Sequence, residues 1–204
     1  MSQQATMNST STISPEEYLE GEKLAYTRHE YIDGKVYAMA GDSRNHNTIA
    51  GNVCMALRAA LRGSPCRVFM ENVKTRIQTT HSSRFYYPDV QVGCNSQQAE
   101  SHEEREPRLI IEVLSSSTER FDRSDKFFAY RQLGSLEEYL LVAQDTRRVE
   151  LFRRSTGWEW ELYTDEEQPI RLDSVGVELH LKDVYEDVEI IEPRSPLDPQ
   201  ERDP

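Results

Sequence analysis

Two carboxylates lie inside apolar segments of this chain, where an ionised group is costly to bury unless a cation compensates it. Asp89 belongs to the run Tyr-Tyr-Pro-Asp-Val-Gln-Val, and Glu112, 23 positions later, lies within Leu-Ile-Ile-Glu-Val-Leu. Carboxylate oxygens are the ligands that hard divalent cations prefer. If the two segments are neighbouring strands of one sheet, we expect both carboxylates to bind one cation.

Each carboxylate also has a structural interpretation. Pro-Asp is a common turn dipeptide, and Glu112 could be one partner of a buried ion pair. Val90 and Val92 favour a strand around Asp89, and the residues on both sides of Glu112 are typical of a strand buried on both faces. We therefore favour metal ligation for both residues.

A lysine on the following segment could complete the site. The apolar residues from Asp122 to Leu133 recur at helical spacing, with Asp122 as the expected N-cap. Lys126 then falls in the first turns, where the positive end of the helix dipole disfavours a cation. This position favours an ammonium that stabilises a developing anion, and the alternative is an ordinary solvated lysine.

Three further residues are candidates for accessory roles. Glu30 is either a further ligand or water-positioning carboxylate, or an exposed strand residue. His46 opens a predicted helix, where capping or packing is favoured over a phosphate contact. Asp122 is favoured as a helix cap over a metal ligand.

Several of these segments together resemble a known family. The segments YYPDVQV, LIIEVLSSST and DRSDKFFAYRQ, preceded by RHEYIDGKVYAMAGDSRNHNTIAGNV, are similar to the Uma-two family of putative restriction endonucleases, within the PD-(D/E)xK nuclease superfamily. The resemblance runs from about Ser14 to about Phe152. It departs from the superfamily motif at Leu114, two residues after Glu112, where the motif lysine normally lies. The resemblance therefore implies that Lys126 supplies the missing ammonium.

The resemblance implies both a fold and an activity. The fold is α/β, a restriction-endonuclease-like α/β/α core with a central mixed sheet and extra β-hairpins. The activity is that of a metal-dependent endonuclease that hydrolyses phosphodiester bonds of nucleic acid, with DNA as the expected substrate and a homodimer as the expected assembly. Asp89, Glu112 and Lys126 would be catalytic. Mg²⁺, for which Mn²⁺ could substitute, would be held by Asp89, Glu112 and the backbone carbonyl of Val113.

Two other functions remain open at this stage. The first is a catalytically weak nuclease-fold module that binds or assembles through a protein partner. The second, hydrolysis of a small phosphoester, is less favoured because the chain has no glycine-rich loop that could hold a phosphate.

The pattern along the chain predicts the elements that position these residues. Asp33-Gly34 favours a tight hairpin turn, and residues 95–107 are typical of a polar loop. We expect helices from Ser14, over Arg44–Arg62 and over Asp122–Leu133, a short helix or turn within Leu179–Asp187, and strands over His29–Met39, Arg67–Ile77, Phe85–Val92, Leu109–Leu114, Tyr139–Val142, Arg148–Arg153 and Trp158–Tyr163.

Length and composition favour one domain over residues 13–192, between disordered tails at 1–12 and 193–204. The net charge of −12 opposes tight binding to phosphate backbones, but 15 acidic and 4 basic residues lie from Glu159 onward, which leaves the preceding part near neutrality.

Cys54, Cys66 and Cys94 are expected to be reduced thiols. The chain shows no apolar run of membrane-spanning length and no signal peptide, so we expect a cytoplasmic protein without membrane contact.

Overall fold

The structure, a computed structural model, describes residues 12–39, 41–94 and 101–190. The predicted tails, 1–12 and 193–204, fall outside these ranges except for residue 12. The strands of the described residues form a six-stranded sheet, a five-stranded sheet and a two-stranded hairpin. None of the described helices is long and apolar enough to cross a membrane.

The six-stranded sheet is mixed and carries most of the core. Its strand order is β11-β10-β9-β8-β6-β3, with β8 and β9 parallel and every other neighbouring pair antiparallel. The strands are β3 (Arg67–Met70), β6 (Val90–Gly93), β8 (Pro107–Leu114), β9 (Glu138–Ala143), β10 (Val149–Arg153) and β11 (Trp160–Tyr163). This architecture confirms the predicted α/β class with a central mixed sheet.

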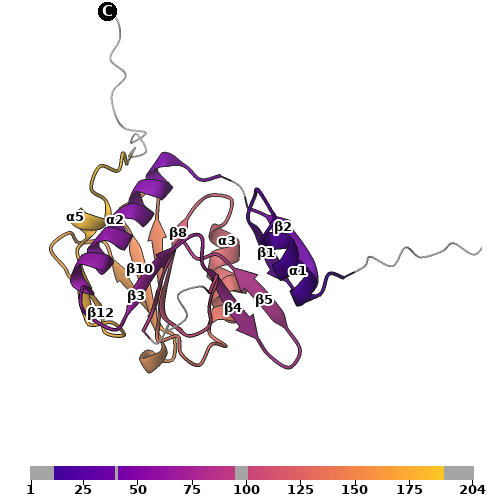
Figure 1. The fold of residues 1–204 in the computed structure, drawn as a ribbon. Coiled ribbons are helices and arrows are strands. Elements are labelled where there is room, and N and C mark those ends of the chain that lie inside the picture. The colour runs from indigo at the N-terminus through magenta and orange to yellow at the C-terminus, as the bar shows by residue number, and fades with distance from the viewer. Residues whose placement is uncertain (1–11, 40, 95–100, 191–204) are drawn as a thin grey trace, which may run out of the picture.

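Helical layers cover both faces of this sheet (Figure 1). The helix α2 (Arg44–Ala60) packs on one face with α5 (Leu181–Val184) and the small hairpin of β12 (Ile170–Leu172) and β13 (Val177–Leu179). A helical segment that ends at Tyr130 packs on the other face. Because side chains alternate along β8, Ile111 and Val113 lie in the core under α2, while Ile110 and Leu114 lie in the core under the other layer.

The five-stranded sheet lies beside the first and has the order β2-β1-β5-β4-β7. Its hairpin turns at Asp33 and Gly34, both with positive φ, as the sequence predicts. Ser14 caps the preceding helix and forms the expected capping box with Glu17. The elements are α1 (Pro15–Glu22), β1 (His29–Ile32), β2 (Lys35–Ala38), β4 (Lys74–Gln78), β5 (Ser83–Tyr86) and β7 (Glu103–Glu104).

Two segments that were each predicted as one strand are each divided into two strands. Arg67–Ile77 divides into β3 and β4, and Phe85–Val92 divides into β5 and β6, with the parts in different sheets. Pro88 has no N–H to donate to a ladder, so the chain leaves one sheet there and enters the other. Asp89 therefore lies at the crossing between the sheets, one residue before β6.

The predicted helix over Asp122–Leu133 begins earlier and is not uniform. It consists of α3 (Glu119–Phe121), a π-helical turn η1 (Asp122–Lys126) and α4 (Phe127–Tyr130). Asp122 is a buried residue within the helical run, so its prediction as the N-cap was wrong. The π-helical turn carries both Asp122 and Lys126, and such turns are frequent at functional sites.

The structure confirms some of the remaining predictions and contradicts others. The hairpin of β10 and β11 and the short helix α5 are confirmed, whereas the hairpin of β12 and β13 was not predicted. The expectation of three reduced thiols was wrong, because Cys66 and Cys94 form a disulfide and only Cys54 is free. Arg67 pairs with Gly93 in the antiparallel register of β3 and β6, which places the adjoining cysteines opposite each other.

Candidate active site

Asp89 and Glu112 are held together by the pairing of β6 with β8. Val90 is the partner of Ile111, so Asp89 continues the strand toward Glu112. The N–H of Asp89 donates to Glu112 Oε2 at 3.3 Å, and the N–H of Val113 donates to Asp89 Oδ2 at 2.6 Å. Two backbone donors therefore fix the carboxylates relative to each other.

The other oxygen of Glu112 faces the helical layer. Lys126 Nζ lies 3.3 Å from Glu112 Oε1, and the Tyr130 hydroxyl donates to the same oxygen at 2.9 Å. Lys126 and Tyr130 are four residues apart, so they lie on the same face of the helical run. Each oxygen of Glu112 thus has its own set of donors.

Lys126 lies among three carboxylates and is buried. Its Nζ is 3.1 Å from Glu30 Oε1, 3.3 Å from Glu112 Oε1 and 3.3 Å from Asp122 Oδ1. A side chain with 8% exposure is not a solvated surface lysine, which removes that alternative. The structure therefore brings Glu30 and Asp122, the two accessory carboxylates, to Lys126.

Glu30 and Asp122 retain unused acceptor capacity. Glu30 Oε1 and Asp122 Oδ1 are buried and accept no hydrogen bond with suitable geometry from the described residues, although both lie close to the Lys126 ammonium. Buried carboxylate oxygens without hydrogen bonds are costly. Besides its ion pair with Lys126, each oxygen keeps acceptor capacity for a further cation.

His46 approaches the site from α2. Its Nε2 lies 3.3 Å from Asp89 Oδ2 and 3.9 Å from Asp42 Oδ1. The helix begins one turn earlier, where the Ser43 hydroxyl accepts the His46 N–H. Burial lowers the pKa of His46, but the hydrogen bond and charge of Asp89, with Asp42 and Glu112, raise it to about 9. The protonated imidazole therefore pairs with Asp89 near neutral pH.

Burial and crowding of like charges dominate the electrostatics of the site. Burial raises the pKa of Glu112 well above its ordinary value; the charge of Lys126 opposes this rise, and the neighbouring carboxylates add to it. Burial lowers the pKa of Lys126, but its carboxylate partners outweigh burial and raise it. Burial and the Glu112 carboxylate raise the pKa of Tyr130, which keeps its hydroxyl as a donor.

These side chains line a cavity of about 250 Å³. Its floor is acidic, with Lys126 and His46 as the basic groups, and one wall is largely apolar. The floor is formed by Glu30, Asp42, His46, Asp89, Glu112, Asp122 and Lys126, and the apolar wall by Tyr37, Ala38, Met39 and Phe121.

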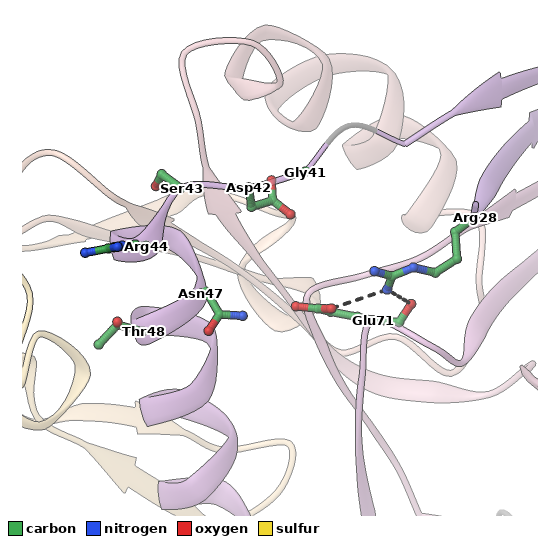
Figure 2. A pocket seen from close by; sticks show the side chains of 8 residues that line it. All are labelled: Arg28, Gly41, Asp42, Ser43, Arg44, Asn47, Thr48 and Glu71. Atoms are coloured by element: carbon green, nitrogen blue, oxygen red, sulfur yellow. Dashed lines mark hydrogen bonds and ion pairs between the residues drawn. The ribbon is translucent and has the colours of Figure 1, made fainter. Parts of the chain in front are cut away.

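A second hollow of about 480 Å³ adjoins this cavity and shares Gly41 and Asp42 with it. Figure 2 shows Asn47 on α2 facing Arg28 and Glu71 across this hollow. Arg28 is held by the backbone oxygen and carboxylate of Glu71, at 2.9 and 3.3 Å. The guanidinium is thus fixed in the hollow that adjoins the acidic cavity.

The donor set suits a hard divalent cation. Within the described ranges, no three His, Cys, Asp or Glu side chains are arranged as a ready-made metal centre. Mg²⁺ is usually held by only one or two carboxylates, with water and substrate phosphate as its other ligands. Asp89 and Glu112 could supply that pair, with unused oxygens from Glu30 and Asp122 nearby. The carbonyl of Val113 stays a predicted ligand on a residue that lines the cavity.

Sequence reasoning missed three residues of the site. Tyr130 donates to Glu112, and the spacing of Asp122, Lys126 and Tyr130 at intervals of four could have indicated a common face. Asp42 lies four residues before His46 in the chain. Tyr37 is the cross-strand partner of Glu30, which becomes apparent only from the register of the hairpin.

Comparisons with known proteins show the family of the chain and support its fold. The model of the Uma2 family, described as putative restriction endonucleases, matches residues 15–182. Two uncharacterised proteins of Synechocystis are similar to this chain. The protein slr1290 is 33% identical over 85% of this chain and 91% of its own length. The protein sll1609 is 34% identical over 75% of this chain and 87% of its own length. A crystal structure of a putative nuclease of the DUF820 group from Anabaena variabilis has a similar fold, with a TM-score of 0.65 and 18% identity over 79% of this chain and 91% of that one.

Proposed function

Because the chain belongs to the Uma2 family of putative restriction endonucleases, we propose that it is a metal-dependent endonuclease that hydrolyses phosphodiester bonds of DNA and uses Mg²⁺. The homodimer that the resemblance implies is part of the same proposal, and sedimentation of the intact chain tests it.

One observation supports this proposal above all others. Asp89, Glu112 and Lys126 come from three different segments of the chain and converge in one cavity, with Glu112 in contact with both of the others. A fold that needed only a structural ion pair would not require three carboxylates around one ammonium. Buried charges of one sign are unfavourable, and perturbed groups in a cleft are typical of functional sites.

Each residue has a chemical task in this proposal. A divalent cation, when bound, polarises the scissile phosphate and lowers the pKa of a water molecule. Asp89 and Glu112 hold that cation, and Tyr130 keeps the Glu112 carboxylate oriented. Lys126 stabilises the negative charge that develops on the phosphate in the transition state. His46 holds the orientation of Asp89 through the contact at 3.3 Å.

The net charge of −12 favours a second candidate, a nuclease-fold module that binds a protein partner and turns over little. This module would keep the acidic cluster as an internal ion network neutralised by Lys126. The two candidates differ in whether a divalent cation activates cleavage.

Cleavage of supercoiled plasmid DNA and of RNA, with Mg²⁺ or with EDTA, tests the proposal. We expect the wild-type protein to nick plasmid with Mg²⁺ only, and Asp89→Asn to abolish nicking. Asp165→Asn, a change at an exposed aspartate that does not line the cavity, is the matched control and should cleave normally. Mg²⁺-independent nicking, or equal nicking by Asp89→Asn, would contradict the proposal, and cleavage of RNA alone would contradict the DNA assignment.

A further inference from the structure

The catalytic groups proposed above are recessed. The side chains of Glu112 and Asp122 are 3% exposed, that of Lys126 is 8% exposed and that of Asp89 is 13% exposed. A phosphate must therefore enter the cavity to reach them. The phosphates of a regular duplex are held in stacked, paired strands, whereas a strand that is locally unpaired can bend inward.

The rim of the cavity carries an accessible aromatic ring. Tyr37 is 48% exposed and lines the cavity, and it is the direct cross-strand partner of Glu30. Partners in an antiparallel pair point to the same face, so the ring lies next to the acidic floor. Met39 and Phe121 also line the cavity. An apolar wall has no task in binding a metal or a phosphate, but it suits the face of a nucleobase.

The charges of the site also disfavour binding of a regular duplex. Five carboxylates line the cavity against Lys126 and His46, and the whole chain has a net charge of −12. Contacts of basic side chains with phosphates, which dominate binding to duplexes, are therefore a weak source of affinity here. Proteins that bind single strands gain affinity from stacking of bases on aromatic rings, which tolerates any sequence.

We propose that the site acts on an unpaired nucleotide, whose base stacks on Tyr37 while its phosphate enters the acidic cavity. This inference rests on the proposed nuclease function and names the substrate class of the same site. The preferred substrate is then a single strand, a loop or a flap.

Two assays test the inference. The first measures KM and kcat for a single-stranded oligonucleotide and for the blunt duplex of the same sequence, with Mg²⁺. The second measures the fluorescence quenching of 2-aminopurine in a single-stranded oligonucleotide on binding with Ca²⁺, which takes oxygen ligands of the same kind. The variants are Tyr37→Ala and Tyr37→Phe. The controls are Val36→Ala, on the opposite face of β2, and Tyr26→Ala, at a fully exposed tyrosine outside the cavity.

We expect the wild-type protein to prefer the single strand at least about tenfold in kcat/KM. Tyr37→Ala should raise KM and weaken binding by about 5- to 150-fold, the range for loss of one stacked base, with kcat little changed. Tyr37→Phe and both controls should behave as wild type. Equal cleavage of single strand and duplex, or unchanged KM in Tyr37→Ala, overturns the inference while the nuclease function stands. If no substrate is cleaved, the proposed function fails, and the quenching assay then decides this inference. Quenching that is present in the wild type and lost in Tyr37→Ala supports base stacking. Absence of quenching in the wild type overturns it.

Discussion

Lys126 and Tyr130, one helical turn apart, both bind Oε1 of Glu112 on β8, at 3.3 and 2.9 Å. Leu114 lies on the same face of β8 as Glu112, two residues further along. The helical layer thus brings an ammonium to the strand face on which the superfamily motif would place its lysine. In this chain the ammonium next to Glu112 therefore comes from the helical layer and not from β8.

Replacing Lys126 with Met should reduce Mg²⁺-dependent cleavage by about 10²- to 10³-fold, the usual loss for one electrostatic donor to a transition state. It should also lower stability by about 3–5 kcal/mol, because three buried carboxylates lose their shared counter-ion. Initial rates of plasmid nicking and denaturant unfolding measure the two effects.

Lys182→Met, at an exposed lysine of α5, is the matched control and should change neither quantity. The double variant Leu114→Lys/Lys126→Met should recover part of the cleavage, because residues two apart on a strand share a face. Full activity of Lys126→Met would show that the ammonium has only a structural role.

Tyr130→Phe should lower activity or metal affinity by about 10- to 100-fold, the range for loss of a partner that orients a ligating carboxylate. The hydroxyl is buried and donates to Glu112, so its removal leaves Oε1 with Lys126 alone. Tyr185→Phe removes another buried hydroxyl, which donates to the carbonyls of Ala143 and Arg148 away from the cavity. Calorimetric titration with Mn²⁺ compares the two variants, and equal affinities would argue against an orienting role for Tyr130.

The sequence predicted the local features of the site better than its long-range contacts. The apolar neighbours of Asp89 and Glu112 indicated adjacent strands, and helical spacing indicated the segment of Lys126, because these signals are local. The break at Pro88 within the predicted strand Phe85–Val92 was missed, because the sheet that each part joins depends on strand pairing. The contact of Glu30 with Lys126 and the Cys66–Cys94 disulfide depend on registers between distant segments, which no local pattern encodes.

His46 should titrate with a pKa of about 9 in EDTA, because Asp89, Asp42 and Glu112 stabilise its charged form. The stability that this proton contributes is complete below about 6.5, the ordinary value, and is lost as the pH rises through about 9. A divalent cation bound to Asp89 should lower the pKa of His46, because like charges repel. NMR titration of the imidazole signals with EDTA and then with Mg²⁺ measures both shifts, and exposed His81 serves as an internal control. Titration of His46 near 6.5 in EDTA would contradict the contact with Asp89.

The purified, non-reduced protein should show one titratable thiol in denaturant, that of Cys54, and three after reduction. Loss of the bridge should lower stability by about 3 kcal/mol, because it closes a loop with a sequence separation of 28. Thiol counting and denaturant unfolding with and without reductant measure these effects. Three free thiols before reduction would show that the cysteines are unpaired.

The most direct test of the metal site is a crystal structure of the protein grown with Mn²⁺, with anomalous scattering recorded at the manganese edge. We expect an anomalous peak within coordination distance of carboxylate oxygens of both Asp89 and Glu112, and none in crystals of Asp89→Asn grown in the same way. A wild-type crystal at saturating Mn²⁺ with no peak between these two carboxylates would contradict the metal-dependent nuclease site.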